Sequence, residues 1–262
     1  MERTKHSTVL IPDLAGKVVL VTGASTGIGA AVARAFAEQG SSVGIHYNTS
    51  AAEASALAED IAVGGGKTFL VRGDVSVPDE MRRIVDETAN HFGRLDGLVN
   101  NAGSMLGRIL YADVTEEHYD AVMDLNAKSV LVACRAALPW LRKNGGFIIN
   151  TSSIVARTGG GGGVGLYASS KAFVSSFTRG LAREVISSGI RVNAVSPGVI
   201  ETRFHERDST PEQLKAALAT IPQGRLGAPS DCVGSFLFLA SDLLSGYITG
   251  QTIEVNGGQA MP

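Results

Sequence analysis

Short apolar runs recur along the chain, and amphipathic stretches separate them. The runs are too short for helices and are bounded by glycine or polar residues, so they predict strands buried on both faces of a sheet. Between them, apolar residues recur every three or four positions, which predicts helices that pack on the sheet. The alternation predicts an α/β fold: a doubly wound, seven-stranded parallel sheet flanked by helices on both faces. The expected strands are 18–21, 43–45, 69–71, 97–99, 147–149, 192–195 and 252–255.

One domain accounts for this pattern. The chain has 262 residues with 44% hydrophobic and 18% charged content, enough to bury a substantial core, and no shift in composition divides it. Residues 1–13 are polar and unpatterned, so we expect a loosely packed N-terminal extension before a domain at 14–262. Residues 204–221, in which Pro211-Glu212 predicts a helix start, are expected to form a mobile substrate lid.

Charge and cysteine usage exclude several classes of function. The formal net charge of −2 and the lack of a basic run argue against nucleic-acid binding. No apolar stretch is long enough to span a membrane, and Met1–Asp13 has no apolar segment typical of a secretory signal. Cys134 and Cys232 lie in apolar helical patterns, so we expect small buried side chains, no metal site and a cytoplasmic location.

A glycine turn follows the first strand and opens the next helix. Gly23, Gly27 and Gly29 permit close approach of the backbone to a bulky anion, and the helix presents unpaired N–H groups at the positive end of its dipole. The natural ligand of such a turn is a dinucleotide pyrophosphate. Taken alone, the turn could also be an ordinary connection between a strand and a helix.

Short polar residues and glycine follow other expected strands, at the sheet edge where ligands bind in doubly wound folds. Asp74 could accept a hydrogen bond from an adenine amino group, or it could form a helix-capping turn. Asn101 could contact a ribose, or it could join neighbouring strands. Two further segments end strands at this edge: Thr151-Ser152-Ser153 and Ser196-Pro197-Gly198.

Tyr167 and Lys171 are the candidate chemical groups. Four residues apart, they lie on one face of a helix, so the lysine ammonium can favour the ionised phenol. A free tyrosine has a pKa of about 10, and acid/base work near pH 7 requires about 4 kcal/mol of differential stabilisation. Ser153 is the candidate donor to the substrate oxygen, and Ser152 is its rival by position.

These motifs resemble the short-chain dehydrogenase/reductase family. The resemblance rests on Thr22-Gly-x-x-x-Gly-x-Gly29, on Asn100-Asn-Ala-Gly103 and on Tyr167-x-x-x-Lys171, and it extends from about residue 14 to the C-terminus. It implies a Rossmann-like fold, nicotinamide-dependent interconversion of a carbonyl and a secondary alcohol, a homotetramer, and a tetrad of Asn126, Ser153, Tyr167 and Lys171. The family pattern favours Ser153 over Ser152 because an apolar pair follows it.

The resemblance also implies the cofactor contacts. Ile200 would meet the nicotinamide amide through its backbone and Thr202 through its hydroxyl group. The full set of expected contacts is Gly23, Ser25, Thr26, Gly27, Ile28, Gly29, Tyr47, Asn48, Thr49, Asp74, Val75, Asn101, Ala102, Gly103, Tyr167, Lys171, Pro197, Gly198, Ile200 and Thr202.

The choice of dinucleotide depends on the end of the second strand. An acidic residue there would bind the ribose 2′-hydroxyl group and repel a 2′-phosphate. Tyr47 occupies that position and no carboxylate follows before Glu53, so NADP(H) is favoured and NAD(H) is the alternative. Two features depart from the family: Thr26 replaces an arginine that is common in NADP-preferring members, and the run Gly159–Gly163 is about one residue longer than usual.

The substrate is the least determined part of the function. The segment Gly224-Arg-Leu-Gly227 and the C-terminal residues resemble those of 3-oxoacyl-thioester reductases, but sugar, polyol and steroid oxidoreductases share them. A nucleotide-sensing protein without catalysis is a further alternative. Such proteins lose the tyrosine or the lysine first, and both are present here.

Overall fold

The seven predicted strands form one parallel sheet. The computed structural model describes residues 9–261, except for the side chains at positions 205 and 206. The strand order is β3-β2-β1-β4-β5-β6-β7, which confirms the doubly wound fold. The strands are β1 (Val18–Val21), β2 (Ser42–Tyr47), β3 (Lys67–Arg72), β4 (Gly97–Asn100), β5 (Gly146–Thr151), β6 (Ile190–Pro197) and β7 (Thr252–Val255).

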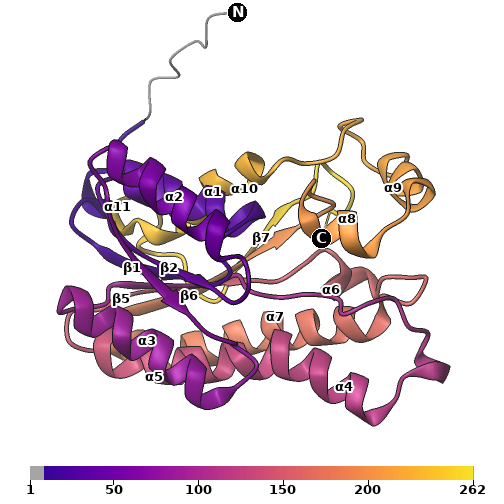
Figure 1. The fold of residues 1–262 in the computed structure, drawn as a ribbon, viewed down its shortest axis with the longest axis horizontal. Coiled ribbons are helices and arrows are strands. Elements are labelled where there is room, and N and C mark those ends of the chain that lie inside the picture. Colours follow the sequence, from indigo (N-terminus) through magenta and orange to yellow (C-terminus); the bar gives the residue numbers. More distant parts are fainter. Residues whose placement is uncertain (1–8, 262) are drawn as a thin grey trace, which may run out of the picture.

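Helices cover both faces of the sheet (Figure 1). One layer contains α1 (Gly27–Glu38), α2 (Ala51–Val63) and α10 (Pro229–Ala240), and the other contains α3 (Pro78–Phe92), α5 (Ser129–Leu141) and α7 (Gly165–Val185). Within β1, Leu20 packs into the α3–α5–α7 core, whereas Val19 and Val21 pack into the α1–α2–α10 core. Both faces of the strand are therefore buried, and this explains why its sequence is continuously apolar.

The smaller elements lie at the two ends of the sheet. Thr115 caps α4 (Glu116–Met123), and its hydroxyl oxygen accepts a hydrogen bond from the His118 N–H. The helical stretch that begins after Thr115 is interrupted by η3, a π-helical turn at Asp124–Lys128. The remaining elements are η1 (Pro12–Leu14), η2 (Tyr111–Asp113), α6 (Val155–Thr158), η4 (Ile186–Ser188), α8 (Arg203–Asp208), α9 (Pro211–Leu218) and α11 (Asp242–Ser245).

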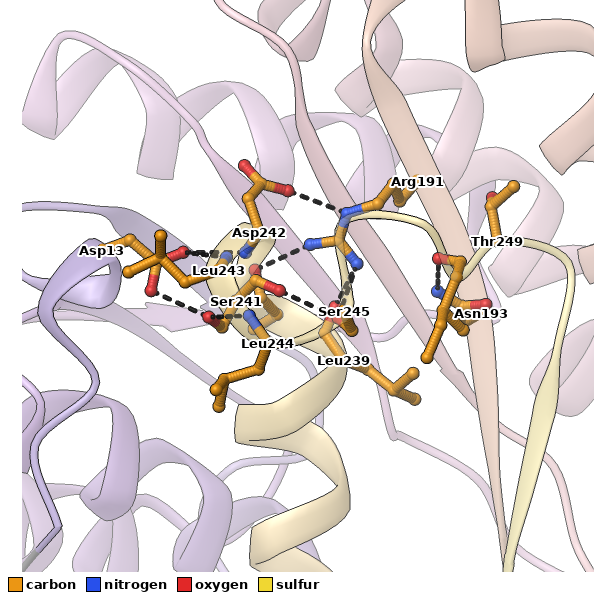
Figure 2. A network of polar contacts seen from close by, with 12 residues as sticks. Asp13, Arg191, Asn193, Leu239, Ser241, Asp242, Leu243, Leu244, Ser245 and Thr249 are labelled. Carbon is orange, nitrogen blue, oxygen red and sulfur yellow. Dashed lines mark hydrogen bonds and ion pairs between the residues drawn. The ribbon is translucent and has the colours of Figure 1, made fainter.

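The N-terminal and C-terminal segments are joined by a polar network, shown in Figure 2. The Asp13 carboxylate accepts hydrogen bonds from the Ser241 hydroxyl group at 2.8 Å and from the Asp242 N–H at 2.7 Å, so it caps α11. Arg191 on β6 is buried and donates to the Leu239 carbonyl oxygen at the end of α10. The expected loosely packed extension therefore ends before Asp13, and its first eight residues lie outside the described part.

The core also contains the two cysteines. Cys134 and Cys232 are buried and unpaired, as predicted, and burial raises the pKa of each thiol to about 12. No helix within residues 9–261 has the length and apolar character needed to cross a bilayer.

Candidate active site

A cavity of about 450 Å³ lies at the carboxyl ends of the strands, where the sequence predicts the chemistry. Its lining contains most of the predicted site residues, drawn from loops that are far apart in the sequence. Those that line it are Gly23, Ser25, Thr26, Gly27, Ile28, Asn48, Thr49, Asp74, Val75, Asn101, Ala102, Gly103, Ser153, Tyr167, Lys171, Pro197, Gly198, Ile200 and Thr202. Gly29, Tyr47 and Asn126 do not line it.

The glycine turn has the form required to hold a pyrophosphate. A Cβ atom on Gly29 would lie 2.2 Å from the Gly23 carbonyl oxygen, so only glycine permits this close contact between turn and helix. Thr26 precedes α1 without capping it through its side chain, and the first N–H groups of the helix are free to bind an anion. The cradle fits the predicted dinucleotide, although Gly29 itself contributes by packing and does not line the cavity.

Two residues that the sequence analysis missed hold this turn in place. The Nδ1 atom of His46 accepts a hydrogen bond from the Gly23 N–H at 2.9 Å, and its Nε2 atom lies 3.0 Å from the Gly73 carbonyl oxygen. Burial lowers the pKa of His46, which favours the neutral ring that this arrangement needs. The Thr22 hydroxyl oxygen accepts hydrogen bonds from the N–H groups of Asn101 and Ala102.

Asn101 and Asp74 each form the structural contacts that were the alternative to cofactor binding. The Asn101 amide donates to the carbonyl oxygens of Thr22 and Gly23, at 3.0 and 3.1 Å, so it joins neighbouring strands. One oxygen of Asp74 accepts hydrogen bonds from the N–H and the hydroxyl group of Ser76, as in a capping turn. Both residues also line the cavity, so the structural role of each is compatible with the predicted cofactor contact.

Tyr47 is the exception among the residues predicted at the adenosine end. Its side chain packs against the α1–α2–α10 core and does not reach the cavity, whereas the next three residues, 48–50, line it. The prediction that Tyr47 contacts the cofactor is therefore not supported. Strand β2 ends at Tyr47, and the alternation of side chains along the strand turns this ring toward the core.

Tyr167 and Lys171 lie together on α7, as their spacing predicts. The Lys171 Nζ atom is 5.7 Å from the centroid of the Tyr167 ring and donates to the Thr151 carbonyl oxygen at 2.8 Å. Burial lowers the pKa of Lys171 to about 8. Burial raises the pKa of Tyr167, and a hydrogen bond with Ser153 opposes this rise. The phenol of this arrangement is protonated at neutral pH and can act as a proton donor.

The two candidate serines have different surroundings. Ser153 is half-buried, lines the cavity and forms its hydrogen bond with Tyr167. The Ser152 hydroxyl group is buried, and its oxygen lies 3.1 Å from the Lys171 carbonyl oxygen and 2.7 Å from the Ser175 hydroxyl oxygen. Only Ser153 therefore has its hydroxyl group beside the phenol.

Asn126 is a buried residue that holds the backbone next to the site. It lies in the π-helical turn, fully buried, and its amide group donates to the carbonyl oxygens of Ser104 and Val122 while accepting from the Ser104 N–H. A Cβ atom on Gly103 would lie 2.7 Å from the Asn126 Oδ1 atom and 3.3 Å from the Lys171 Nζ atom. Asn126 and Lys171 thus border the same glycine, Gly103.

The segment predicted to form a lid contributes residues to the lining of the cavity, and α8 begins just before it, at Arg203. The Phe204 ring lies 5.5 Å from the Tyr167 ring. Thr202 faces the glycine turn, where a Cβ atom on Gly27 would lie 3.1 Å from its methyl group. A helix does begin at Pro211, as predicted, and Thr210 caps it. Further lining residues that sequence reasoning missed include Met105, Arg108, Leu125, Val164, Arg203, Arg207, Gln213 and Leu214.

Comparison with known proteins is consistent with this geometry. Residues 23–260 match the model of a family described as enoyl-(acyl carrier protein) reductase. The chain is 41% identical, over 94% of its length, to the 3-oxoacyl-[acyl-carrier-protein] reductase FabG of Staphylococcus aureus, and it covers 98% of that protein.

Two solved structures are similar over nearly the whole chain. The NADH-dependent reductase A1-R′ responsible for alginate metabolism is 36% identical with a TM-score of 0.89, covering 96% of this chain and 100% of that one. A short chain dehydrogenase from Burkholderia cenocepacia J2315 in complex with NADP is 34% identical with a TM-score of 0.87, covering 94% and 98%. The chain therefore belongs to the short-chain dehydrogenase/reductase family and is an oxidoreductase that uses NAD or NADP.

Proposed function

We propose that this protein reduces a ketone to a secondary alcohol, with Tyr167 as the proton donor. The observation that carries the proposal is the contact of Ser153 with the Tyr167 phenol above buried Lys171. Ser153 orients the substrate oxygen, Tyr167 gives it the proton, and the nearby Lys171 stabilises the phenolate that remains. Asn126 fixes the loop beside Lys171. The bound cofactor supplies the hydride to the carbonyl carbon.

A 3-oxoacyl thioester is the first candidate substrate. It is supported by the 41% identity to a 3-oxoacyl-[acyl-carrier-protein] reductase over nearly the full length of both chains. A sugar-derived carbonyl compound is the second candidate, since a similar structure is that of a reductase responsible for alginate metabolism. Polyols and steroids are further alternatives from the sequence, and no contact in the cavity favours either.

NADP(H) is the proposed preferred cofactor. Asn48, Thr49 and Ser50 line the adenosine end of the cavity and offer neutral donors. Arg72 adds a cation beside them, because its Nε atom donates to the Asn48 carbonyl oxygen at 3.2 Å. Arg34, by contrast, is paired with Asp60. Solved relatives include both an NADH-dependent enzyme and a complex with NADP, so family membership leaves the preference open.

We also propose a homotetramer in the cytoplasm. Large apolar side chains are exposed on three helices: Tyr119 on α4, Leu131 on α5 and Phe173 on α7. An apolar surface of this kind is typical of contacts between subunits. Two buried, unpaired thiols agree with a reducing compartment.

A panel of carbonyl compounds tests the proposed reaction. Purified enzyme with NADPH or NADH would be offered 3-oxoacyl thioesters, sugar-derived ketones and a steroid ketone, and the loss of the absorbance of the reduced nicotinamide would be followed. We expect turnover of the thioester with NADPH. Turnover confined to sugar-derived ketones would select the second candidate, and no turnover with any compound would reject the proposed reaction.

A further inference from the structure

Within the described residues, one arginine on the substrate side of the cavity has no acidic partner. Within the described residues the lining contains four cationic side chains and a single carboxylate, Asp74, at the adenosine end. Arg203 is ion-paired with Glu53 on α2, and Arg207 is paired with Asp208 at 3.0 Å. Lys171 belongs to the proposed proton-transfer group. The fourth is Arg108, which forms no ion pair with any carboxylate in the described part of the chain.

Arg108 is held by neutral oxygen atoms. Its Nε atom donates to the Asp208 carbonyl oxygen at 2.7 Å, and one terminal nitrogen donates to the Ser209 hydroxyl oxygen at 3.1 Å. The other terminal nitrogen lies 3.5 Å from the Gly162 carbonyl oxygen. None of these partners is charged, so the guanidinium retains its full positive charge. A guanidinium has five N–H donors, and some remain available to a ligand.

The unusual glycine run positions this arginine. The Ile109 N–H donates to the Gly163 carbonyl oxygen at 3.1 Å. Gly163 has a φ of +83°, and a Cβ atom there would lie 2.8 Å from the Arg108 carbonyl carbon. Any larger residue at position 163 would displace the Arg108 backbone. The run that distinguishes this chain from the common family spacing therefore packs directly against Arg108.

Arg108 is on the same side of the cavity as the proposed proton donor. Gly163 is followed by Val164, which also lines the cavity, and by α7, which carries Tyr167. The lid segment that binds the Arg108 side chain also places Phe204 against the Tyr167 ring. Asp74, the one acidic lining residue described, is bonded to Ser76 at the adenosine end and forms no ion pair with Arg108.

We propose that Arg108 binds an anionic oxygen group of the substrate, so that the substrates are carbonyl compounds that carry a negative charge. This inference rests on the proposed function and specifies its substrate class. Planar guanidinium groups bind carboxylate and phosphate oxygens with two parallel hydrogen bonds. The anion is either a carboxylate on the carbonyl compound itself or a phosphate on the carrier of a 3-oxoacyl thioester.

Two matched substrate pairs separate these sources. The first pair is levulinate and methyl levulinate, which differ by a carboxylate charge. The second is acetoacetyl-coenzyme A and the acetoacetyl thioester of N-acetylcysteamine, which differ by the phosphate-bearing arm. Each pair would be assayed with the wild type, Arg108→Gln and Arg108→Lys, and with Arg142→Gln as a control at an exposed arginine outside the cavity.

We expect Arg108→Gln to lower kcat/KM about tenfold or more for the charged member of one pair, mainly through KM, and to leave the neutral member unchanged. Arg108→Lys should recover part of the loss, and Arg142→Gln should match the wild type. A loss confined to levulinate identifies a carboxylate, and a loss confined to the coenzyme A thioester identifies a phosphate. Equal effects of Arg108→Gln on both members of each pair would overturn the inference.

Binding provides a readout that does not require turnover. If the wild type reduces none of the four compounds, the proposed substrates fail, and thermal shift with NADP⁺ and levulinate then decides the inference. Stabilisation of the wild type that Arg108→Gln lacks would support anion binding at Arg108. No stabilisation of the wild type by levulinate or by the coenzyme A thioester would overturn it.

Discussion

Ser153 and Ser152 are adjacent in the sequence and have opposite surroundings. The Ser152 hydroxyl group is enclosed by the Lys171 backbone and Ser175, whereas Ser153 reaches the phenol of Tyr167. Both serines follow β5, which ends at Thr151. The Ser152 N–H still donates to the Val195 carbonyl oxygen of β6, so the backbone remains extended there and turns successive side chains to opposite sides. Both serines line the cavity, but only Ser153 has its hydroxyl group beside the phenol.

Exchanging each serine separately tests this assignment. Ser153→Ala should lower kcat by two to three orders of magnitude, roughly what removal of one donor to a developing charge costs. Ser152→Ala should retain most of the activity and lower the melting temperature, because it removes the buried hydrogen bonds of Ser152 with the Lys171 carbonyl oxygen and Ser175. Steady-state rates and thermal unfolding of both variants provide the comparison. A larger loss of kcat for Ser152→Ala would show that the wrong serine was chosen.

Thr49 is the residue at which cofactor preference should be reversed. Tyr47 is turned toward the core, and the Asn48 side chain is bonded to Asp74, so an added carboxylate at 48 would be repelled. Thr49→Asp should lower kcat/KM with NADPH at least tenfold by repelling the 2′-phosphate, with little effect on NADH. Thr49→Asn is the matched neutral control. A wild-type enzyme more efficient with NADH than with NADPH would contradict the proposed preference.

Residues were predictable from the sequence where a local spacing carried the information. Tyr167 and Lys171 follow from one helical turn, and Gly23 and Gly27 from a strand-to-helix turn. His46 and Arg108 were missed because their roles depend on partners that are distant in the sequence, such as Gly73 for His46 and Asp208 for Arg108. Nothing in the neighbouring sequence indicates such contacts.

The glycine turn is the element on which cofactor binding should depend most. A Cβ atom on Gly29 would overlap the Gly23 carbonyl oxygen at 2.2 Å and the Asn101 amide nitrogen at 2.5 Å, both of which are held by their own hydrogen bonds. The neighbouring atoms cannot move apart without breaking the Asn101 bridge. Strain in α1 would be transmitted to the turn that we expect to hold the pyrophosphate.

Gly29→Ala should therefore weaken NADPH binding and destabilise the fold by about 1–3 kcal/mol, the usual cost of overpacking. Gly180→Ala is the matched control, because Gly180 lies on the exposed side of α7 with open space around a Cβ atom. That control should gain up to about 1 kcal/mol from helix propensity. Denaturant unfolding and a cofactor titration measure both effects. A Gly29→Ala protein that binds NADPH with wild-type affinity would contradict the importance of this contact for cofactor binding.

At the scale of elements, the spacing of apolar residues predicted the strands and helices, because burial imposes that spacing. The seven strands and the helix start at Pro211 were all found, because each depends on a local pattern. The π-helical turn around Asn126 was not predicted. It arises where the Asn126 side chain binds the Ser104 backbone, 22 residues away. A helical sequence pattern does not reveal such a tertiary contact.

At the scale of the whole molecule, we expect a homotetramer. Light scattering should give four times the chain mass, and Leu131→Glu should reduce that mass by placing a charge in an apolar contact. Val63→Glu is the control, since Val63 is exposed at the end of α2, in the opposite helical layer. A monomeric wild-type protein, or a tetramer that Leu131→Glu leaves intact, would contradict the proposal that this apolar surface forms a contact between subunits.

The central claim is that Tyr167 donates the proton in a carbonyl reduction. The most direct measurement is the kcat of Tyr167→Phe with NADPH and a reducible carbonyl substrate, together with the Kd of NADPH for the same protein. The substitution removes the hydroxyl group that contacts Ser153 and preserves the ring that packs against Phe204. We predict a fall in kcat of at least about a hundredfold, with the Kd of NADPH close to the wild-type value. A Tyr167→Phe enzyme that turns over at a rate near that of the wild type would contradict the account.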